Sequence, residues 1–531
     1  MTRAVAGRCL RWVRLPCLHE WLLIAVLLGM THRYLWLMDD SFVYFRYADN
    51  ALFLDRGLVY NAGEYVEGYS SPLWMLLLLA CRASELDYYS LVRCLALVCA
   101  ASYGLALVWV NRRMTVPVLR PVINFPLAAS AAHYGITTHF SSGLETPLVQ
   151  LCAPLYAAAL LRPSCGWLQL AMGLVPLVRA ECGLLWLGYL PWVWLRTRRV
   201  PWLFLWSAGL ANGAWLCFRV WYYADLLPNT FYLKDVAQWG LGWEYLYNVS
   251  ETHHWPWVLF GLACCALLGR RYLARAQLTP RAILLSSALA YALYVARIGG
   301  DMLYHRYAAL PVCLLLCASA GVVEAAVLPR VPVVPPLARR MVAAYCASAL
   351  CGAFGAAYPR QLDTHPFWFA ENLHNWRAVS DASWHRHHED LRYSVKRREE
   401  DAVQRAAYAR LRARGELKDP PIFVEGFCRT GYKRIAGYVI NDYGLTDAVL
   451  ARLPRPFGRP GHKFVQQEAQ DLKALRLAAR RRPQLRWYQF AQAPAWVKKN
   501  QQGLAELEQK QGNSHVFQAN FALAVQPVHL E

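Results

Sequence analysis

Residues 37–72, LMDDSFVYFRYADNALFLDRGLVYNAGEYVEGYSSP, determine how the rest of the chain is interpreted. They follow the first strongly apolar segment, residues 21–36, and open with two adjacent carboxylates, Asp39 and Asp40. Acidic side chains at the end of a membrane helix usually face a cavity and mark a functional site. The apolar residues that follow recur at helical spacing, which predicts a short amphipathic helix with both acids at its N-terminus, where the helix dipole stabilises negative charge. The alternative is a capped helix in the membrane interface whose acids are incidental.

The composition indicates a membrane protein. Of the 531 residues, 56% are hydrophobic, and many apolar runs approach the ~20 residues that cross a bilayer. The N-terminus has a basic start and an apolar run but no convincing small-residue cleavage site, so we expect a retained first span. The fold class predicted is an α-helical polytopic membrane protein.

The net charge of +21 indicates basic cytoplasmic loops and a basic tail. No nucleic-acid motif accompanies the charge, so the expected partners are membrane lipids or a phosphate-bearing lipid and not nucleic acid. The 16 cysteines lie mostly within apolar segments, and they form neither zinc-type CxxC pairs nor a disulfide framework.

Arginine and lysine mark the cytoplasmic ends of membrane spans. Residues 73–80 are apolar but too short to cross. The preference of arginine and lysine for the cytoplasmic side places the acid-rich loops on one side of the membrane and the arginine clusters on the other. About eleven crossings are expected, at residues 18–36, 89–110, 121–138, 147–161, two within 166–195, 201–222, 255–268, 282–298, 308–328 and 341–358.

Because the N-terminus is expected on the cytoplasmic side, an odd number of crossings places the C-terminal tail on the outer side of the membrane. The expected division is a membrane catalytic domain at 1–358, with a first periplasmic loop at 38–72, and a soluble C-terminal periplasmic domain at 359–531. Short strands are predicted at 420–424 and 437–440, which indicates a small α+β domain. Residues 503–531 are interpreted as a terminal strand pair.

No phosphate-binding glycine loop, HExxH or nucleophile elbow is present. A carboxylate can instead act as general base on an acceptor hydroxyl, and cations can hold a phosphate leaving group. Together with an apolar groove, such groups suit transfer from a lipid-phosphate donor. The candidates on the expected outer face are Asp39, Asp40, Glu145, Arg179, Glu181, Asp225, Asn229, Lys234, Asp301, His305 and Arg306.

Each candidate also has a plainer interpretation. Glu145 suits the N-terminus of the fourth span, and Arg179 with Glu181 suits an ion pair that staples a turn. Asp301 follows two glycines and suits bonds to the loop backbone. His305 and Arg306 suit ordinary interface anchors.

Several motifs, in this order along the chain, resemble the GT-C membrane glycosyltransferases. More narrowly, they resemble the polyprenyl-phosphate-dependent arabinofuranosyltransferases that act on mycobacterial cell-wall arabinan or on type IV pilin. These motifs are DDSFVYFRYADN, GLVYNAGEYVEGYSSPLW, SSGLETPL, RAE, DLLPNTFYLK, GGDMLYHRY, DYGLTD and RPGHK, between residues 39 and 463.

The resemblance implies a GT-C fold and a polyprenyl-phosphate sugar donor used on the periplasmic side. It places a catalytic aspartate at Asp39 or Asp40, with Glu145 in the same cavity and Asp301 and Arg306 near the donor phosphate. A divalent cation is implied for some members. Relatives tend to have Arg-Pro-Glu at the position of Arg179-Ala180-Glu181. This chain has alanine in place of the proline but keeps both charged residues.

The expected function is the transfer of a sugar to a glycan or pilin hydroxyl at the bacterial inner membrane, and the resemblance implies that this sugar is D-arabinofuranose. Asp39 or Asp40 would deprotonate or orient the acceptor. Arg306, His305 and Lys234 would stabilise the leaving phosphate, and the remaining groups would shape the site. The alternatives are a hexosyl transferase of the same fold, a lipid-linked-sugar transporter and a structural envelope protein.

Overall fold

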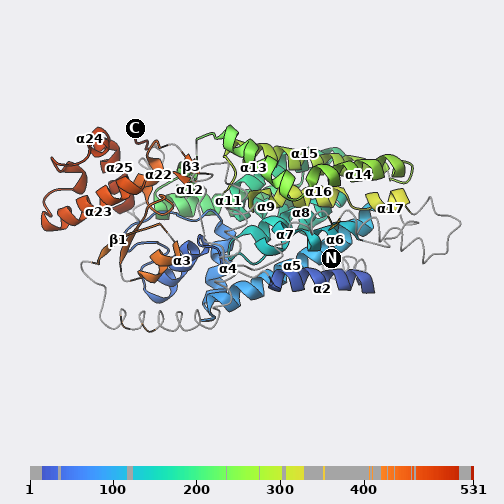
Figure 1. The fold of residues 1–531 in the computed structure, drawn as a ribbon, viewed down its shortest axis with the longest axis horizontal. Coiled ribbons are helices and arrows are strands. Elements are labelled where there is room, and N and C mark those ends of the chain that lie inside the picture. Colours follow the sequence, from blue (N-terminus) through green and yellow to red (C-terminus); the bar gives the residue numbers. More distant parts are fainter. Residues whose placement is uncertain are drawn as a thin grey trace.

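A computed structural model gives the arrangement of the chain. It describes residues 15–33, 37–115, 124–234, 236–273, 275–301, 306–327, 351–352, 406, 410, 420–426, 428–435, 437–455, 457–459, 462–463, 465–512 and 528–531. The expected crossing at 341–358 and the boundary at 358 fall largely outside these residues, and so does His305. Apolar helices gather at one end of the molecule and the C-terminal elements at the other (Figure 1).

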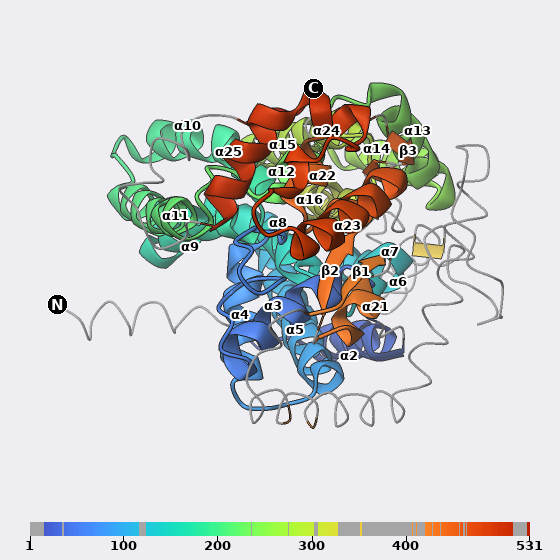
Figure 2. The same cartoon turned by 90° about the vertical axis from the view of Figure 1, so that its left-hand side faces the viewer.

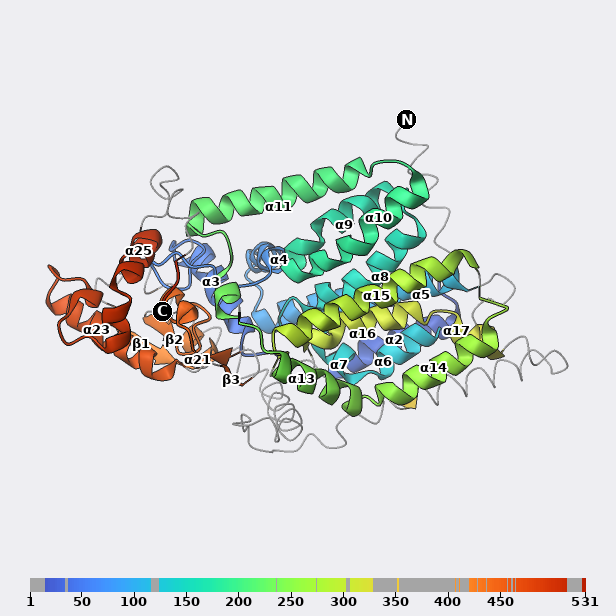
Figure 3. The same ribbon diagram turned by 90° about the horizontal axis from the view of Figure 1, so that it is seen from above.

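The first two thirds of the described chain are helical. The helices are α2 (Leu18–Arg33), α3 (Ser41–Phe53), α4 (Pro72–Arg82), α5 (Tyr88–Met114), α6 (Phe125–Ala132), α7 (Tyr134–His139), α8 (Thr146–Leu161), α9 (Gly166–Val178), η2 (Ala180–Leu184), α10 (Leu185–Thr197), α11 (Trp202–Tyr223), α12 (Asn229–Leu233), α13 (Trp239–Thr252), α14 (Trp255–Gly269), α15 (Arg275–Arg297), η3 (Arg306–Ala308), α16 (Ala309–Ala318) and α17 (Val322–Val327). Figure 3 shows α11 along α9 and α10 at one edge of the bundle, with α13 and α14 at the opposite edge.

Local signals start several of these helices. The Ser71 hydroxyl accepts a hydrogen bond from the Trp74 amide at 3.2 Å, and Pro72 occupies the first turn of α4. Asp87 caps α5 in the same way through the Ser90 amide at 2.9 Å. Such caps satisfy backbone N–H groups that have no partner within the helix.

In the described part of the chain, three helical stretches are long and apolar enough to cross a membrane: α5, α15 and Arg306–Ala326. Several shorter apolar helices accompany them, including α4, α8, α9 and α14. Large apolar side chains such as Trp206, Leu210 and Trp257 are exposed on the outer helices. These features confirm a helical membrane protein.

Helix α3 was expected to be amphipathic, and this expectation is wrong. Every residue from Ser41 to Asn50 is buried, on all sides of the helix. It is covered by α4 and by the C-terminal α21 (Cys428–Lys433), as Figure 2 shows. The alternative of a surface helix in the membrane interface does not fit this burial either, because such a helix exposes its polar face.

The C-terminal elements mix helices with short strands. β1 (Ile422–Glu425) and β2 (Tyr438–Asn441) pair in parallel, close to the two predicted strands. The terminal strand pair is wrong for the described part of 503–531, because Gln501–Gly512 forms a helix. The remaining elements are α22 (Ala448–Arg452), β3 (Phe457–Arg459), β4 (His462–Lys463), α23 (Gln466–Arg481), η6 (Trp487–Gln489), α24 (Ala495–Lys499) and α25 (Gln501–Gly512).

A buried arginine joins the loop after α2 to the C-terminal elements. Arg46, on α3, is fully buried and donates to the Tyr60 carbonyl at 2.7 Å within its own loop. It also donates to the carbonyls of Gly431, Arg434 and Gly437 at 2.7, 3.1 and 2.8 Å. One guanidinium therefore satisfies a carbonyl in its own part of the chain and three carbonyls that lie more than 380 residues further along the sequence.

Replacing Arg46 by Met is expected to lower the free energy of unfolding by at least about 3 kcal/mol, because several buried carbonyls lose their donor. Thermal unfolding in detergent and proteolysis of the segment after residue 420 measure this. Arg434→Met is the control: its guanidinium pairs with Glu425 while half exposed, so its loss is expected to change stability by less than about 1 kcal/mol. Equal effects of the two variants would contradict the role given to Arg46.

Candidate active site

A cavity of about 740 Å³ opens between α3, the start of α8, the turn between α9 and η2, α11, α12 and η3. One part of its wall is apolar, with Pro176, Leu184, Leu216 and Phe231 among the lining residues. The other part is charged, and its cations outnumber its carboxylates. The charged lining residues are Asp40, Glu145, Glu181, Arg179, Arg219, Lys234, Arg297 and Arg306.

The two adjacent aspartates face different surroundings. Asp39 accepts hydrogen bonds from the backbone N–H groups of Cys428 and Arg429, at 2.8 and 3.0 Å. Asp40 lines the cavity, and its carboxylate lies 3.6 Å from the Arg306 guanidinium. The Asp40 side chain is 26% exposed, so a ligand in the cavity can reach it. The sequence left open which aspartate is the base, and only Asp40 faces the cavity.

Burial raises the pKa of both aspartates. For Asp39 the pKa rises to about 6, although the two backbone N–H groups that it accepts stabilise the charged form. For Asp40, burial is the main cause, Arg306 and Lys234 act in the opposite direction, and Asp301 adds to the rise. A carboxylate with a raised pKa is a stronger base than an ordinary aspartate.

Arg306 begins η3 and is held by a turn that precedes it. Its Nε donates to Asp301 at 2.6 Å, and Asp301 is buried beneath it. Gly299 and Gly300 both have positive φ, and a Cβ at Gly300 would lie 2.4 Å from the Tyr245 ring. The two glycines therefore allow the turn that brings Asp301 under the guanidinium. Among the described residues, the partner of Asp301 is the Arg306 guanidinium.

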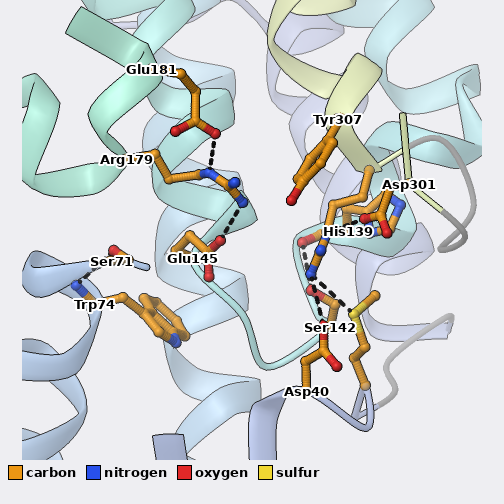
Figure 4. A network of polar contacts seen from close by, with 12 residues as sticks. Asp40, Ser71, Trp74, His139, Ser142, Glu145, Arg179, Glu181, Asp301 and Tyr307 are labelled. Atoms are coloured by element: carbon orange, nitrogen blue, oxygen red, sulfur yellow. Dashed lines mark hydrogen bonds and ion pairs between the residues drawn. The ribbon is translucent and has the colours of Figure 1, made fainter. Parts of the chain in front are cut away.

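Arg179 joins two acids from different elements. Its Nη1 donates to Glu145 at 2.7 Å and its Nε donates to Glu181 at 2.5 Å, as Figure 4 shows. Glu145 precedes α8 but makes no capping bond. Its other oxygen accepts from the Tyr44 hydroxyl at 3.2 Å. Glu145 therefore stands at the helix start, as its plainer interpretation expected, but its carboxylate is bonded to Arg179 and Tyr44. The pairing expected between Arg179 and Glu181 is confirmed.

Lys234 follows α12 and lines the same cavity. Its ammonium donates to the Tyr307 hydroxyl at 2.6 Å. Among the described residues, no carboxylate pairs with Lys234, whereas Arg179 and Arg306 each have two acidic neighbours. An ammonium on a cavity wall without a carboxylate is available to an anionic ligand.

The cavity thus brings together most of the predicted residues: Asp40, Glu145, Arg179, Glu181, Lys234 and Arg306, with Asp301 directly behind Arg306. Asp39 points to the C-terminal segment, by which we mean the described residues between 428 and 447. Asp225 and Asn229 also turn away, because Asp225 pairs with Arg452 at 2.5 Å and Asn229 donates to the carbonyls of Gly444 and Leu445. His305 lies outside the described residues.

Sequence reasoning missed several residues that line the cavity, among them Tyr44, Tyr307, Arg219 and Arg297. Tyr44 lies one helical turn after Asp40, and Tyr307 directly follows Arg306, but tyrosines near the loops were interpreted as membrane-interface anchors. Arg219, which pairs with the buried Glu67, lies within an apolar helix. An arginine inside such a helix is itself a signal of a functional site.

The donor set does not fit the divalent cation that the resemblance implies. The group nearest to such a site in the described chain is Asp39, Asp40 and Cys428, whose ligand atoms lie within 4.8 Å of one another. Both oxygens of Asp39 already accept backbone N–H groups, and magnesium or calcium prefers oxygen to sulfur. Burial and the two carboxylates raise the pKa of the Cys428 thiol well above its usual value, which keeps it protonated.

Comparison with known proteins supports the resemblance read from the motifs. The terminal β-(1→2)-arabinofuranosyltransferase of Mycobacterium tuberculosis is 30% identical over 347 residues, which cover 56% of this chain and 54% of the relative. The protein of the same name from Corynebacterium glutamicum is 28% identical over 335 residues, covering 53% and 47%. The chain therefore spans about half the length of these curated relatives. No protein-family model matches the chain, and no solved structure matches it.

The raised pKa of Asp39 predicts a pH-dependent stability. Between about pH 4 and pH 6 the folded chain keeps a proton that the unfolded chain has released, so the contribution of Asp39 to stability falls as pH rises through this window. The difference in melting temperature between wild type and Asp39→Asn is expected to change between pH 4 and 6 and to be constant above pH 7. A difference that is flat over the whole range would contradict the raised pKa.

Proposed function

We propose that the protein is a membrane glycosyltransferase that moves a sugar, D-arabinofuranose, from a polyprenyl-phosphate donor to the hydroxyl of a glycan or pilin. The observation that carries the proposal is one cavity in which a partly exposed carboxylate, Asp40, lies beside cations and an apolar wall. The choice of sugar is supported by the names of the two relatives, which are arabinofuranosyltransferases.

The donor would occupy the cavity with its phosphate among Arg179, Lys234 and Arg306. These cations stabilise the negative charge that develops on the phosphate as it leaves. The first isoprene units would lie along the apolar wall contributed by α9, η2, α11 and α12. Because α11 also exposes large apolar side chains on its outer side, this wall gives a lipid tail an apolar route to the bilayer.

Asp40 would act as the general base. The acceptor oxygen attacks the anomeric carbon, its proton passes to the Asp40 carboxylate, and the bond between the anomeric carbon and the phosphate oxygen breaks. The lipid leaves as a phosphate monoester. Glu145 and Glu181 hold Arg179 in place for this step, and Asp301 does the same for Arg306.

The proposal includes the placement of the molecule. We infer a GT-C arrangement with about eleven transmembrane helices in a bacterial inner membrane. The cavity and the C-terminal elements, as a soluble α+β domain, would lie on the periplasmic side. The support is the distribution of charge along the sequence, with acid-rich loops and arginine clusters on opposite sides.

Asp40→Asn is expected to lower the rate of transfer from a synthetic polyprenyl-phosphoryl arabinofuranose by about 10²- to 10⁴-fold, because the base is lost while its shape is kept. Asp39→Asn is expected to keep much more activity, since Asp39 faces the C-terminal segment. Asp87→Asn is the control, because asparagine caps a helix as well as aspartate does. Release of lipid phosphate by purified protein measures all three. Full activity of Asp40→Asn would overturn the assignment.

Lys234→Met is expected to raise the KM for the donor about tenfold and to leave the KM for the acceptor unchanged. The variant removes a charge that has no carboxylate partner in the described chain, so no buried acid is left unpaired. Steady-state kinetics with each substrate varied in turn tests this. A change confined to the KM for the acceptor would place the phosphate elsewhere.

A further inference from the structure

We propose that the hydroxyl of Tyr307 is a further catalytic group, which donates a hydrogen bond to the phosphate oxygen that separates from the sugar. This inference rests on the proposed function and assigns a role to a residue that none of the charged-group arguments includes. It is carried by the position of the phenol among three cations and by the direction of the hydrogen bond that it makes with Lys234.

Three cationic groups surround the Tyr307 ring. The guanidinium carbons of Arg179 and Arg306 lie 4.7 and 5.1 Å from the ring centroid, and the Lys234 ammonium lies 4.9 Å from it. These cations come from the turn after α9, from η3 and from the end of α12. An aromatic ring attracts cations through the negative charge of its faces, so Tyr307 helps to hold three mutually repelling groups around one point.

The hydrogen bond with Lys234 fixes what the phenol can do. An ammonium group has no acceptor, so Lys234 donates and the Tyr307 oxygen accepts, at 2.6 Å. The phenolic hydrogen remains available, and within the described part of the chain no protein oxygen accepts it. In Figure 4 the Tyr307 hydroxyl points into the space between Arg179 and Asp40, where the reacting atoms of the proposed complex would lie.

The chemistry of the step needs a donor at this point. As the bond between the anomeric carbon and oxygen breaks, both bonding electrons stay on the oxygen, which becomes a terminal oxygen of the lipid phosphate. Arg179, Arg306 and Lys234 balance the overall charge, but a donor directed at this one oxygen stabilises the transition state more than the bound substrate. The phenol keeps its proton, while Asp40 takes the proton of the acceptor.

A purely structural role for Tyr307 makes a different prediction. If the ring only positions the cations, phenylalanine can replace tyrosine, because the ring is retained. If the hydroxyl is the donor, the same substitution removes it. The matched control is Tyr156→Phe, which removes a buried hydroxyl bonded to Ser287 at 3.1 Å, outside the cavity lining.

The experiment uses full-length protein, a short polyprenyl-phosphoryl arabinofuranose and one acceptor. For Tyr307→Phe we expect kcat to fall about 10²-fold, which is the usual effect of removing one donor to a developing charge. The KM for the donor is expected to change less than about threefold. Inhibition by free polyprenyl phosphate is expected to weaken about tenfold, because the product oxygen carries more charge than the bridging oxygen of the substrate. Tyr156→Phe is expected to resemble wild type in all three values.

Tyr307→His keeps a ring with a donor and is expected to recover part of the lost rate. The inference would be overturned if Tyr307→Phe had the kcat and the product inhibition of wild type. It would also be overturned if this variant raised only the KM for the donor and left kcat unchanged, or if Tyr307→His were no faster than Tyr307→Phe. If wild type itself releases no lipid phosphate from this donor, the proposed function fails first. An active wild type with an unaffected Phe variant refutes only the role of Tyr307.

Discussion

Two adjacent carboxylates at the start of a helix cannot point the same way, and the arrangement of the site depends on this constraint. Asp39 is held by two backbone N–H groups of the C-terminal segment, and Asp40 turns into the cavity toward Arg306. Both side chains are partly buried, so a partner helps each of them to remain charged. The contact made by Asp39 therefore fixes the loop that presents Asp40, and it ties this loop to residues nearly 390 positions further along the chain.

The balance of charge in the cavity also follows from the need of each shielded charge for a partner. Arg179 and Arg306 are each paired with two acids, and these pairs need no ligand to be stable. Lys234 has only the Tyr307 hydroxyl in the described chain. These ion pairs hold the two arginines in place in this structure, and they leave one ammonium and one phenol to respond to a bound anion. In the proposed complex, this arrangement would be organised before the donor phosphate binds.

Sequence patterns predicted many of the helices because an apolar run of membrane length has few other solutions. They also predicted both β1 and β2, which are bounded by prolines and glycines. They could not predict that α3 is buried on every side, because its cover comes from Cys428–Lys433, distant in sequence. For the site, charged residues were recognised individually, but the partners of Asp39 and Arg179 are tertiary contacts that no local pattern contains. Tyr307 was missed because a tyrosine near a membrane surface is usually an interface anchor.

The contacts between the C-terminal segment and the first loop bear on how the cavity is built. Leu445 lines the cavity, and the carbonyls of Gly444 and Leu445 accept from Asn229, which begins the helix that ends before Lys234. Arg46 and Asp39 attach the same segment to α3, which follows Asp40. Both the carboxylate and the ammonium are therefore positioned through the C-terminal segment. A displacement of that segment would move Asp40 and Lys234 relative to Arg306 and Tyr307, which are held by a different helix, so the segment belongs to the site as much as the membrane helices do.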